Sequence, residues 1–255
     1  MLEVQLFSSY EANTLPNITL SQTDISVLIT GETKPFRYLA RHLAIPTELY
    51  FAVDLGCSTG ETTHVLSKRY RRVVGVDISS EPISKARLSF PGVDFRIFDV
   101  LTDREALQAL INEEPTSSST VFFIDIGGDR LQDTVLILIN HITETFHPPL
   151  IVVKSRKLFK FLSRNCLDAD GIHCKIDLWQ RLIQSTLDKQ ECDKKYFHSR
   201  RRLTFFVPGT QIPICQYHNY QVCKKGDECS FSHSYCHVCL QQGHRALECD
   251  VFHKD

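Results

Sequence analysis

The stretch Asp54-Leu55-Gly56-Cys57-Ser58-Thr59-Gly60 follows an apolar run at residues 50–55 and opens a segment with helical periodicity. Glycine at such a strand-to-helix turn lets the backbone approach a ligand closely, and the helix N-terminus supplies N–H donors. The sequence contains neither the Gly-x-Gly-x-x-Gly pattern of dinucleotide-binding turns nor the lysine pattern of a P-loop. The stretch therefore predicts a ligand-binding turn of another kind.

Strands and helices alternate on both sides of this turn. Short apolar runs, rich in β-branched or aromatic residues as buried parallel strands are, occur at residues 50–55, 72–78, 93–100, 120–126 and 149–155. Helical segments are predicted at 60–70, 80–90, 103–112 and 131–146, and a late strand at 201–207 would close the sheet. The pattern predicts an α/β fold with a doubly wound, mostly parallel sheet.

Three parts of the chain differ in pattern. Residues 1–48 form an N-terminal extension, with a strand at 2–7 and a short helix at 36–43. Residues 49–208 hold the predicted α/β domain. Pro208-Gly209 and Pro213 then mark a linker, after which residues 209–255 form a small, cysteine-rich tail.

Composition excludes several classes of protein. Lys+Arg 29 against Asp+Glu 30 gives a net charge of -1, so a wholly basic nucleic-acid-binding surface is excluded. No apolar run approaches the roughly 18 residues of a membrane span, and the N-terminus lacks the basic region of a secretory signal. We therefore expect an intracellular protein, nuclear or cytoplasmic, with no membrane partner.

The glycine turn resembles motif I of the class I S-adenosylmethionine-dependent methyltransferases, whose pattern is acid-x-Gly-x-Gly-x-Gly, with Ser58 replacing the middle glycine. Later strands also end in acids, in the family's order. The resemblance implies a Rossmann-like fold with S-adenosylmethionine as cofactor. Asp77 would bind the ribose hydroxyls, Asp99 the adenine amino group, and Asp125 would lie beside the transferable methyl. The other implied cofactor-binding residues are those of the glycine turn: Asp54, Gly56, Ser58 and Gly60.

The residues around Asp125 bear on which atom is methylated. The Asn/Asp-Pro-Pro-aromatic motif of amine methylation is absent, and no cysteine for pyrimidine chemistry lies near Asp125 or Lys154. Lys34, Asp125 and Lys154 resemble three members of the catalytic set of FtsJ-like and fibrillarin-like RNA ribose 2′-O-methyltransferases. The resemblance implies RNA as substrate and a lysine that helps to deprotonate the 2′-hydroxyl.

Two departures keep other functions open. The family's later Lys-x-x-x-Ser-Arg stretch has a counterpart at residues 195–200, but its final Glu is replaced by the stretch Arg202-Leu203-Thr204. One alternative is a non-catalytic RNA-binding protein on a methyltransferase scaffold, and another is a protein methyltransferase. The retained motif I and Asp77 argue against the scaffold alternative.

Six of the ten cysteines lie in the tail, where the absence of a secretory signal favours metal ligands over disulfides. Two sets have the spacings of a CCCH zinc finger (215–233) and a CCHC zinc knuckle (236–249): Cys215, Cys223, Cys229, His233; and Cys236, Cys239, His244, Cys249. Four ligands each predict two closed, structural zinc sites, and we expect the two modules to unfold independently.

Both zinc modules are of kinds that bind single-stranded RNA, and a protein partner of the knuckle is the alternative. Candidate stacking residues are Tyr217, Tyr220, Phe231 and Tyr235. Basic clusters occur at 68–72, at 156–164 and around 194–202. The cluster at 156–164 follows the end of a predicted strand, and the cluster around 194–202 flanks the late strand. Both are therefore candidates for substrate contact.

Overall fold

The computed structural model describes residues 2–8, 24–43, 50–114, 120–126, 132–165, 167–168, 172–194, 205–220 and 223–249. The chain forms two compact units, Met1–Thr186 and Leu187–Asp255. The predicted domain boundary near residue 208 therefore falls inside the second unit, and the predicted extension 1–48 is part of the first. No helix in the described ranges is both long and apolar enough to span a membrane.

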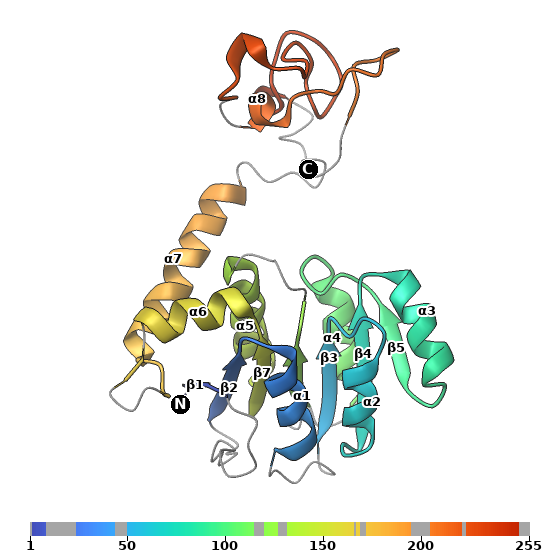
Figure 1. Ribbon diagram of the computed structural model, residues 1–255, viewed down its shortest axis with the longest axis vertical. Helices are drawn as coiled ribbons and strands as arrows, with labels where there is room; N and C mark the ends of the chain where they lie inside the picture. The colour runs from blue at the N-terminus through green and yellow to red at the C-terminus, as the bar shows by residue number, and fades with distance from the viewer. Residues whose placement is uncertain are drawn as a thin grey trace. The chain divides into compact units, whose positions relative to one another are not determined.

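The first unit is built on a seven-stranded parallel sheet in the order β1-β2-β7-β6-β3-β4-β5 (Figure 1). The strands are β1 (Leu2–Leu6), β2 (Ile25–Thr30), β3 (Phe51–Leu55), β4 (Arg72–Asp77), β5 (Asp94–Ile97), β6 (Thr120–Ile124) and β7 (Leu150–Lys154). The predicted α/β class and doubly wound parallel sheet are confirmed. Every residue of β3 and of β6 is buried, which explains why these strands read as continuous apolar runs.

Helices cover both faces of the sheet (Figure 1). The helices of the first unit are α1 (Thr33–His42), α2 (Glu61–Ser67), α3 (Ser80–Ser89), α4 (Arg104–Asn112), α5 (Gln132–Phe146), α6 (Arg156–Asn165) and α7 (Ile176–Lys194), the last of which continues into the second unit. On one face α1 and α2 pack through Phe36 and Leu66. On the other, α4 to α7 share one apolar core, which contains the chain's single tryptophan, Trp179.

The N-terminal strands β1 and β2 form one side of the sheet, and residues 205–207 of the predicted late strand do not extend it. The position beside β7 in the sheet is occupied by β2, which pairs with β7 from Ser26↔Leu150 to Thr30↔Lys154. Residues 201–204 lie outside the described residues, and Phe206 forms an isolated bridge with Pro213 inside the second unit. Strand β2 and helices α6 and α7 were not among the predicted elements.

The second unit contains little regular structure. Beyond the end of α7, its described residues form one short helix, α8 (Gln216–Tyr220), and two 3₁₀ turns, Gly226–Glu228 and Ala246–Glu248. Its apolar cluster is small and includes three cysteines, namely Cys236, Cys249 and the partly buried Cys239. So small a core cannot offset the chain entropy lost on folding, which is the physical reason to expect metal ions in this unit.

Candidate functional site

A pocket of about 470 Å³ lies at the carboxyl ends of the strands. From β3 the chain builds the sheet outward through β4 to β5, and then returns to β6 on the other side of β3. Ligands of doubly wound sheets bind at this switch point. The pocket is lined by Gly56, Ser58, Val76, Asp77, Ile78, Ser79, Pro82, Phe98, Asp99, Val100, Leu101, Asp125, Ile126 and Lys154.

The turn after β3 requires glycine at position 56. Gly56 has a φ of +86°, and a Cβ added there would lie 2.1 Å from the backbone oxygen of Asp125. The N–H groups of Gly56 and Cys57 both donate to the carbonyl oxygen of Val76, at 2.8 and 3.0 Å. The ends of β3, β4 and β6 can therefore meet closely enough to form the floor of the pocket only if this residue has no side chain.

Gly60 has a different role from the one implied by the family motif. It caps helix α2 with a φ of +80°, and a Cβ there would lie 2.6 Å from the ring of Phe95. Gly60 does not line the pocket. Because it has no side chain, α2 can pack closely against its neighbours. Ser58 does line the pocket, in a left-handed conformation with a φ of 49°.

Asp77 is held in a fixed orientation at the end of β4. Its two carboxylate oxygens accept hydrogen bonds from the backbone N–H groups of Ser58 and Ser79, each at 2.9 Å. A carboxylate has about four acceptor sites, so lone pairs remain for two ribose hydroxyls. The geometry supports the predicted role and shows that Asp77 also orders the glycine turn.

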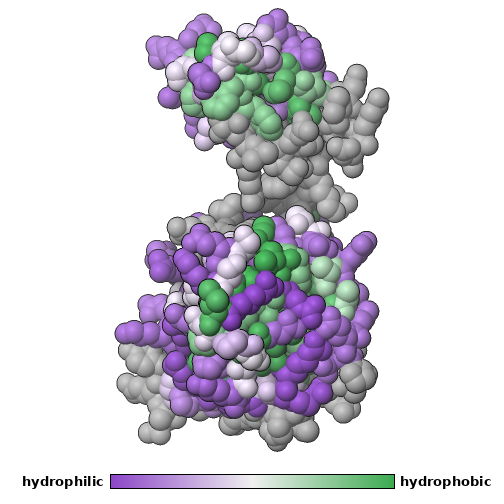
Figure 2. Space-filling view, turned by 90° about the vertical axis from the view of Figure 1, so that its right-hand side faces the viewer, coloured by the Kyte–Doolittle hydropathy of each residue, from purple (hydrophilic) through white to green (hydrophobic). Residues whose placement is uncertain are grey.

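Around Asp99 the pocket lining is mostly apolar, and Asp99 accepts a hydrogen bond from the N–H of Leu101 at 3.0 Å. Ile78, directly after Asp77, is 53% exposed although it lines the pocket, together with Phe98. Sequence reasoning missed these apolar residues, whose signal was their position next to each strand-end acid. Figure 2 shows apolar surface within a hydrophilic surround on one face of the first unit.

Asp54 does not contact the pocket, so the prediction that it binds the cofactor directly lacks support. It is 1% exposed and accepts a hydrogen bond from the Thr63 hydroxyl at 2.7 Å. Burial raises the pKa of Asp54 to about 7; the bond from Thr63 opposes the shift, and the charges of Asp125 and Asp77 add to it. Gly75, which sequence reasoning also missed, makes room for Thr63, since a Cβ there would lie 2.8 Å from its hydroxyl oxygen.

Asp125 and Lys154 form an ion pair at the edge of the pocket. The Lys154 ammonium lies 2.8 and 3.1 Å from the two carboxylate oxygens of Asp125, and the side chains are 19% and 24% exposed, respectively. The residues are brought together because β6 and β7 are adjacent parallel strands that end at the same edge. The partner of Lys154 is therefore a carboxylate.

Lys34 is not part of this ion pair. It is exposed in the first turn of α1 and lines a separate hollow of about 320 Å³ with Thr33, Arg37, Tyr38 and Arg41. It is not among the residues that line the cofactor pocket. Its predicted catalytic role therefore has no support from the geometry.

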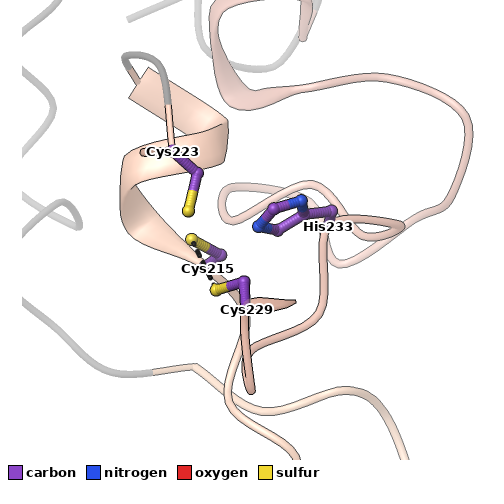
Figure 3. Close-up of side chains that lie close together, drawn as sticks. All are labelled: Cys215, Cys223, Cys229 and His233. Atoms are coloured by element: carbon purple, nitrogen blue, oxygen red, sulfur yellow. Dashed lines mark hydrogen bonds between the residues drawn. The ribbon is translucent and has the colours of Figure 1, made fainter. Parts of the chain in front are cut away.

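The first zinc-ligand set is assembled in the second unit. The side chains of Cys215, Cys223, Cys229 and His233 converge, and their ligand atoms lie within 4.8 Å of one another (Figure 3). The Nε2 atom of His233 is buried without a hydrogen-bond partner among the described residues. A hydrogen bond from the backbone N–H of Lys225 lowers the pKa of Cys223, which favours the thiolate that metals bind. These features fit zinc.

The second set, Cys236, Cys239, His244 and Cys249, is assembled in the same way, with all ligand atoms within 4.8 Å of one another. The Cys239 sulfur lies 3.2 Å from Nε2 of His244. Three thiols and one imidazole form a donor set that suits tetrahedral zinc. All eight predicted ligands therefore lie where two metal ions would require them.

A residue that sequence reasoning missed links the two sets. Asn219, fully buried in α8, donates to the carbonyl oxygens of Cys215 and Tyr235, at 3.2 and 3.0 Å. Its side-chain oxygen accepts from the N–H groups of His237 and Ala246, both at 2.8 Å. The finger and the knuckle thus share one buried hydrogen-bond centre.

The candidate stacking residues differ in exposure. Tyr217 and Phe231 are 66% and 46% exposed, so both rings are accessible, whereas Tyr235 is partly buried. The Tyr220 side chain lies outside what the structure describes. His218 is stacked on the ligand His233, with ring centroids 4.3 Å apart, and so supports the metal site.

The three basic clusters differ in whether their side chains are bound within the protein or exposed. In the cluster at 68–72, Arg69 donates to the carbonyl oxygens of Ala40 and Leu43, and Arg71 and Arg72 pair with Glu114. This cluster therefore stabilises the fold. The cluster around 194–202 lies outside the described side chains, and the cluster at 156–164 lies on the exposed surface of α6.

Comparison with known proteins gives a family match over part of the first unit. Residues 52–114 match a family model described as a methyltransferase domain. Among solved structures, the 23S rRNA methyltransferase ErmE is 18% identical, with a TM-score of 0.35, over 48% of this chain and 46% of that one. DesVI of Streptomyces venezuelae has the same identity and TM-score over 48% of this chain and 52% of that one. The chain thus aligns with only about half of each. No curated protein matches the sequence.

The family match covers the glycine turn and the strand-end acids Asp77 and Asp99. The match places a methyltransferase domain in the first unit, called the methyltransferase unit below, and the pocket lies at the switch point of its parallel sheet.

Proposed function

We propose that the protein methylates RNA, with a ribose 2′-hydroxyl as the acceptor, and that its two zinc modules present the RNA. The observation that carries the proposal is the Asp125–Lys154 pair at the edge of the pocket. A hydroxyl needs both a proton acceptor and a stabiliser of negative charge before it can attack a methyl group. A carboxylate and an ammonium held side by side provide the two functions.

The pocket residues would hold the cofactor at both ends. Asp77 accepts hydrogen bonds from the ribose hydroxyls, and Asp99 faces the adenine. The backbone at Gly56 and Ser58 borders the rest of the cofactor. S-adenosylmethionine, when bound, supplies an electrophilic methyl group on a sulfonium. Asp125 and Lys154 lie at the part of the pocket formed by β6 and β7, across from the acids that fix the nucleoside.

In this proposal the Asp125 carboxylate would take the proton of the acceptor hydroxyl, and the hydroxyl oxygen would receive the methyl group that the cofactor supplies as the carbon–sulfur bond breaks. The Lys154 ammonium stabilises the charge that develops on that oxygen. The roles follow from the observed pair, in which the lysine is bound to a carboxylate, and they require neither Lys34 nor the missing Glu. The second product is S-adenosylhomocysteine.

The zinc ions would have a structural role. Each of the two sets supplies four protein ligands, which leaves no open position for a reacting water. Zinc would bind Cys215, Cys223, Cys229 and His233 in the finger and Cys236, Cys239, His244 and Cys249 in the knuckle. The exposed rings of Tyr217 and Phe231 can then stack with unpaired bases.

A test is transfer of labelled methyl from S-adenosylmethionine to total RNA, with and without ribonuclease. We expect ribonuclease-sensitive label and 2′-O-methylated nucleosides by mass spectrometry. Lys154→Ala should abolish turnover without weakening cofactor affinity, and Lys85→Ala, which removes an exposed lysine on α3, is the matched control. Label in protein would favour the protein methyltransferase, and RNA binding without transfer would favour the non-catalytic scaffold.

A further inference from the structure

Two helices of the methyltransferase unit carry only positive charges. Helices α1 and α6 contain no aspartate or glutamate, although the chain has 30 acidic residues. Their cations are Lys34, Arg37 and Arg41 in α1, and Arg156, Lys157, Lys160 and Arg164 in α6. Because the net charge of the chain is -1, this concentration of positive charge is a local property of these two helices.

Both helices begin beside Lys154. Strands β2 and β7 are paired so that Thr30 lies opposite Lys154, and the N–H of Ser155 donates to the Thr30 carbonyl oxygen at 2.9 Å. Helix α1 follows β2, and α6 follows β7. Gly31, between β2 and α1, packs against the ring of Phe159 of α6. The helices therefore leave the same edge of the sheet and cover its opposite faces.

Most of these cations are exposed and have no acidic partner among the described residues. Arg37 pairs with Glu61, but Arg156, Lys160 and Arg164 project from α6 without an ion pair in the described part of the chain. The arginines of the 68–72 cluster, by contrast, are bound to Glu114 and to backbone carbonyls. The structure thus separates cations that stabilise the fold from cations that remain available to a ligand.

The hollow on α1 adds an aromatic ring to this surface. Tyr38 lines it with Lys34, Arg37 and Arg41, and the ring of Tyr38 is buttressed by Phe7, with centroids 6.3 Å apart. On α6 the spacing of Arg156, Lys160 and Arg164 is four residues, or ~6 Å along the helix axis. Repeated cations beside an aromatic ring suit a nucleic-acid strand, because phosphates bind the cations and a base can stack.

We propose that α1 and α6 form one RNA-binding surface, the α1–α6 basic surface, which holds the phosphates on both sides of the acceptor nucleotide at the Asp125–Lys154 pair. The inference rests on the proposed function and adds the path of the substrate strand across the methyltransferase unit. It gives this unit its own RNA contacts, independent of the zinc modules.

The experiment compares two double variants of the full-length, zinc-loaded protein. Lys160→Gln/Arg164→Gln removes two charges from the α1–α6 basic surface, and Lys68→Gln/Lys85→Gln removes two exposed charges elsewhere as the matched control. The binding of a fluorescent 20-nucleotide single-stranded RNA is measured by anisotropy across a salt series. The first variant should bind about tenfold more weakly, with a salt slope lower by about 0.7 for each lost phosphate contact. The control should match the unaltered protein.

Cofactor affinity measured by calorimetry should be the same in all three proteins, which shows that the variants are folded. An unchanged RNA affinity and salt slope in Lys160→Gln/Arg164→Gln, in a protein that methylates RNA, would overturn the α1–α6 basic surface and leave the proposed function standing. Competition by polyglutamate as strong as that by RNA would overturn it in favour of an acidic peptide. If the unaltered protein transfers no methyl to RNA, the proposed function fails, and this inference fails with it.

Discussion

Asp54 illustrates how its surroundings decide the role of a single residue. Its carboxyl group is fully buried, with a pKa raised from 3.8 to about 7, chiefly because burial disfavours the charged form. The unfolded chain loses this proton first as the pH rises, so the free energy of unfolding should fall between about pH 4 and pH 7. The shift corresponds to at most about 4 kcal/mol.

Asp54→Asn should remove that pH dependence. We expect the free energies of unfolding of the two proteins to diverge progressively from pH 4 to pH 7, with the variant more stable at the upper end. Urea unfolding followed by the fluorescence of the single tryptophan, Trp179, reports on the methyltransferase unit alone. Parallel pH profiles for the two proteins would show that Asp54 ionises normally.

Asp77 provides a test of cofactor binding at the same scale. Asp77→Ala removes the proposed acceptor of two ribose hydroxyls and the partner of the Ser58 and Ser79 N–H groups. We expect the affinity for S-adenosylmethionine, measured by calorimetry, to fall by about 1.5–3 kcal/mol. Asp94→Ala is the control, because Asp94 is the first residue of the neighbouring strand β5 and so lies at the opposite end of the sheet from Asp77. This variant should bind S-adenosylmethionine normally. An unchanged affinity in Asp77→Ala would exclude the proposed ribose contact.

At the scale of elements, Asn219 ties α8 to the knuckle. The sequence predicts that the two zinc modules unfold independently, so that Cys229→Ser or Cys239→Ser would each release one ion and disrupt one module. The structure adds hydrogen bonds between one buried amide and both modules. We therefore expect loss of one zinc ion to weaken retention of the other.

Asn219→Ala tests this link. It leaves the buried N–H groups of His237 and Ala246 without their partner, at about 1–3 kcal/mol for each group. Zinc analysis should find two ions per chain in the unaltered protein. A chromogenic chelator should remove both ions faster from the variant than from Asn112→Ala, a surface control on α4. Faster release of one ion alone would support independent modules.

At the scale of the whole molecule, the two units should contribute separable functions. A chain ending near Pro208 keeps the whole methyltransferase unit and lacks both zinc-ligand sets, so it should bind S-adenosylmethionine normally. Its activity on the natural RNA should fall mainly through a raised KM, because remote contacts recruit the substrate without touching the reacting atoms. Steady-state kinetics of the two chains would check this, and an unchanged KM would remove the zinc modules from substrate binding.

The sequence by itself determined the features that depend on residues close together in the chain. The glycine turn, the acids at strand ends and the two zinc-ligand sets follow local rules of conformation and spacing, and the structure assembles each of them. The parallel sheet could be predicted because buried strands require continuous apolar runs. The functional roles of these residues stay predictions.

Only the tertiary structure decided which distant residues meet. Strand β2 lies between β1 and β7, so the N-terminal strands form this side of the sheet and α1 begins next to Lys154. Packing buries Asp54 away from the pocket and leaves Lys34 exposed on α1, while adjacent strands pair Lys154 with Asp125. Burial and ion pairing depend on three-dimensional neighbours far apart in the chain, and no local pattern encodes them.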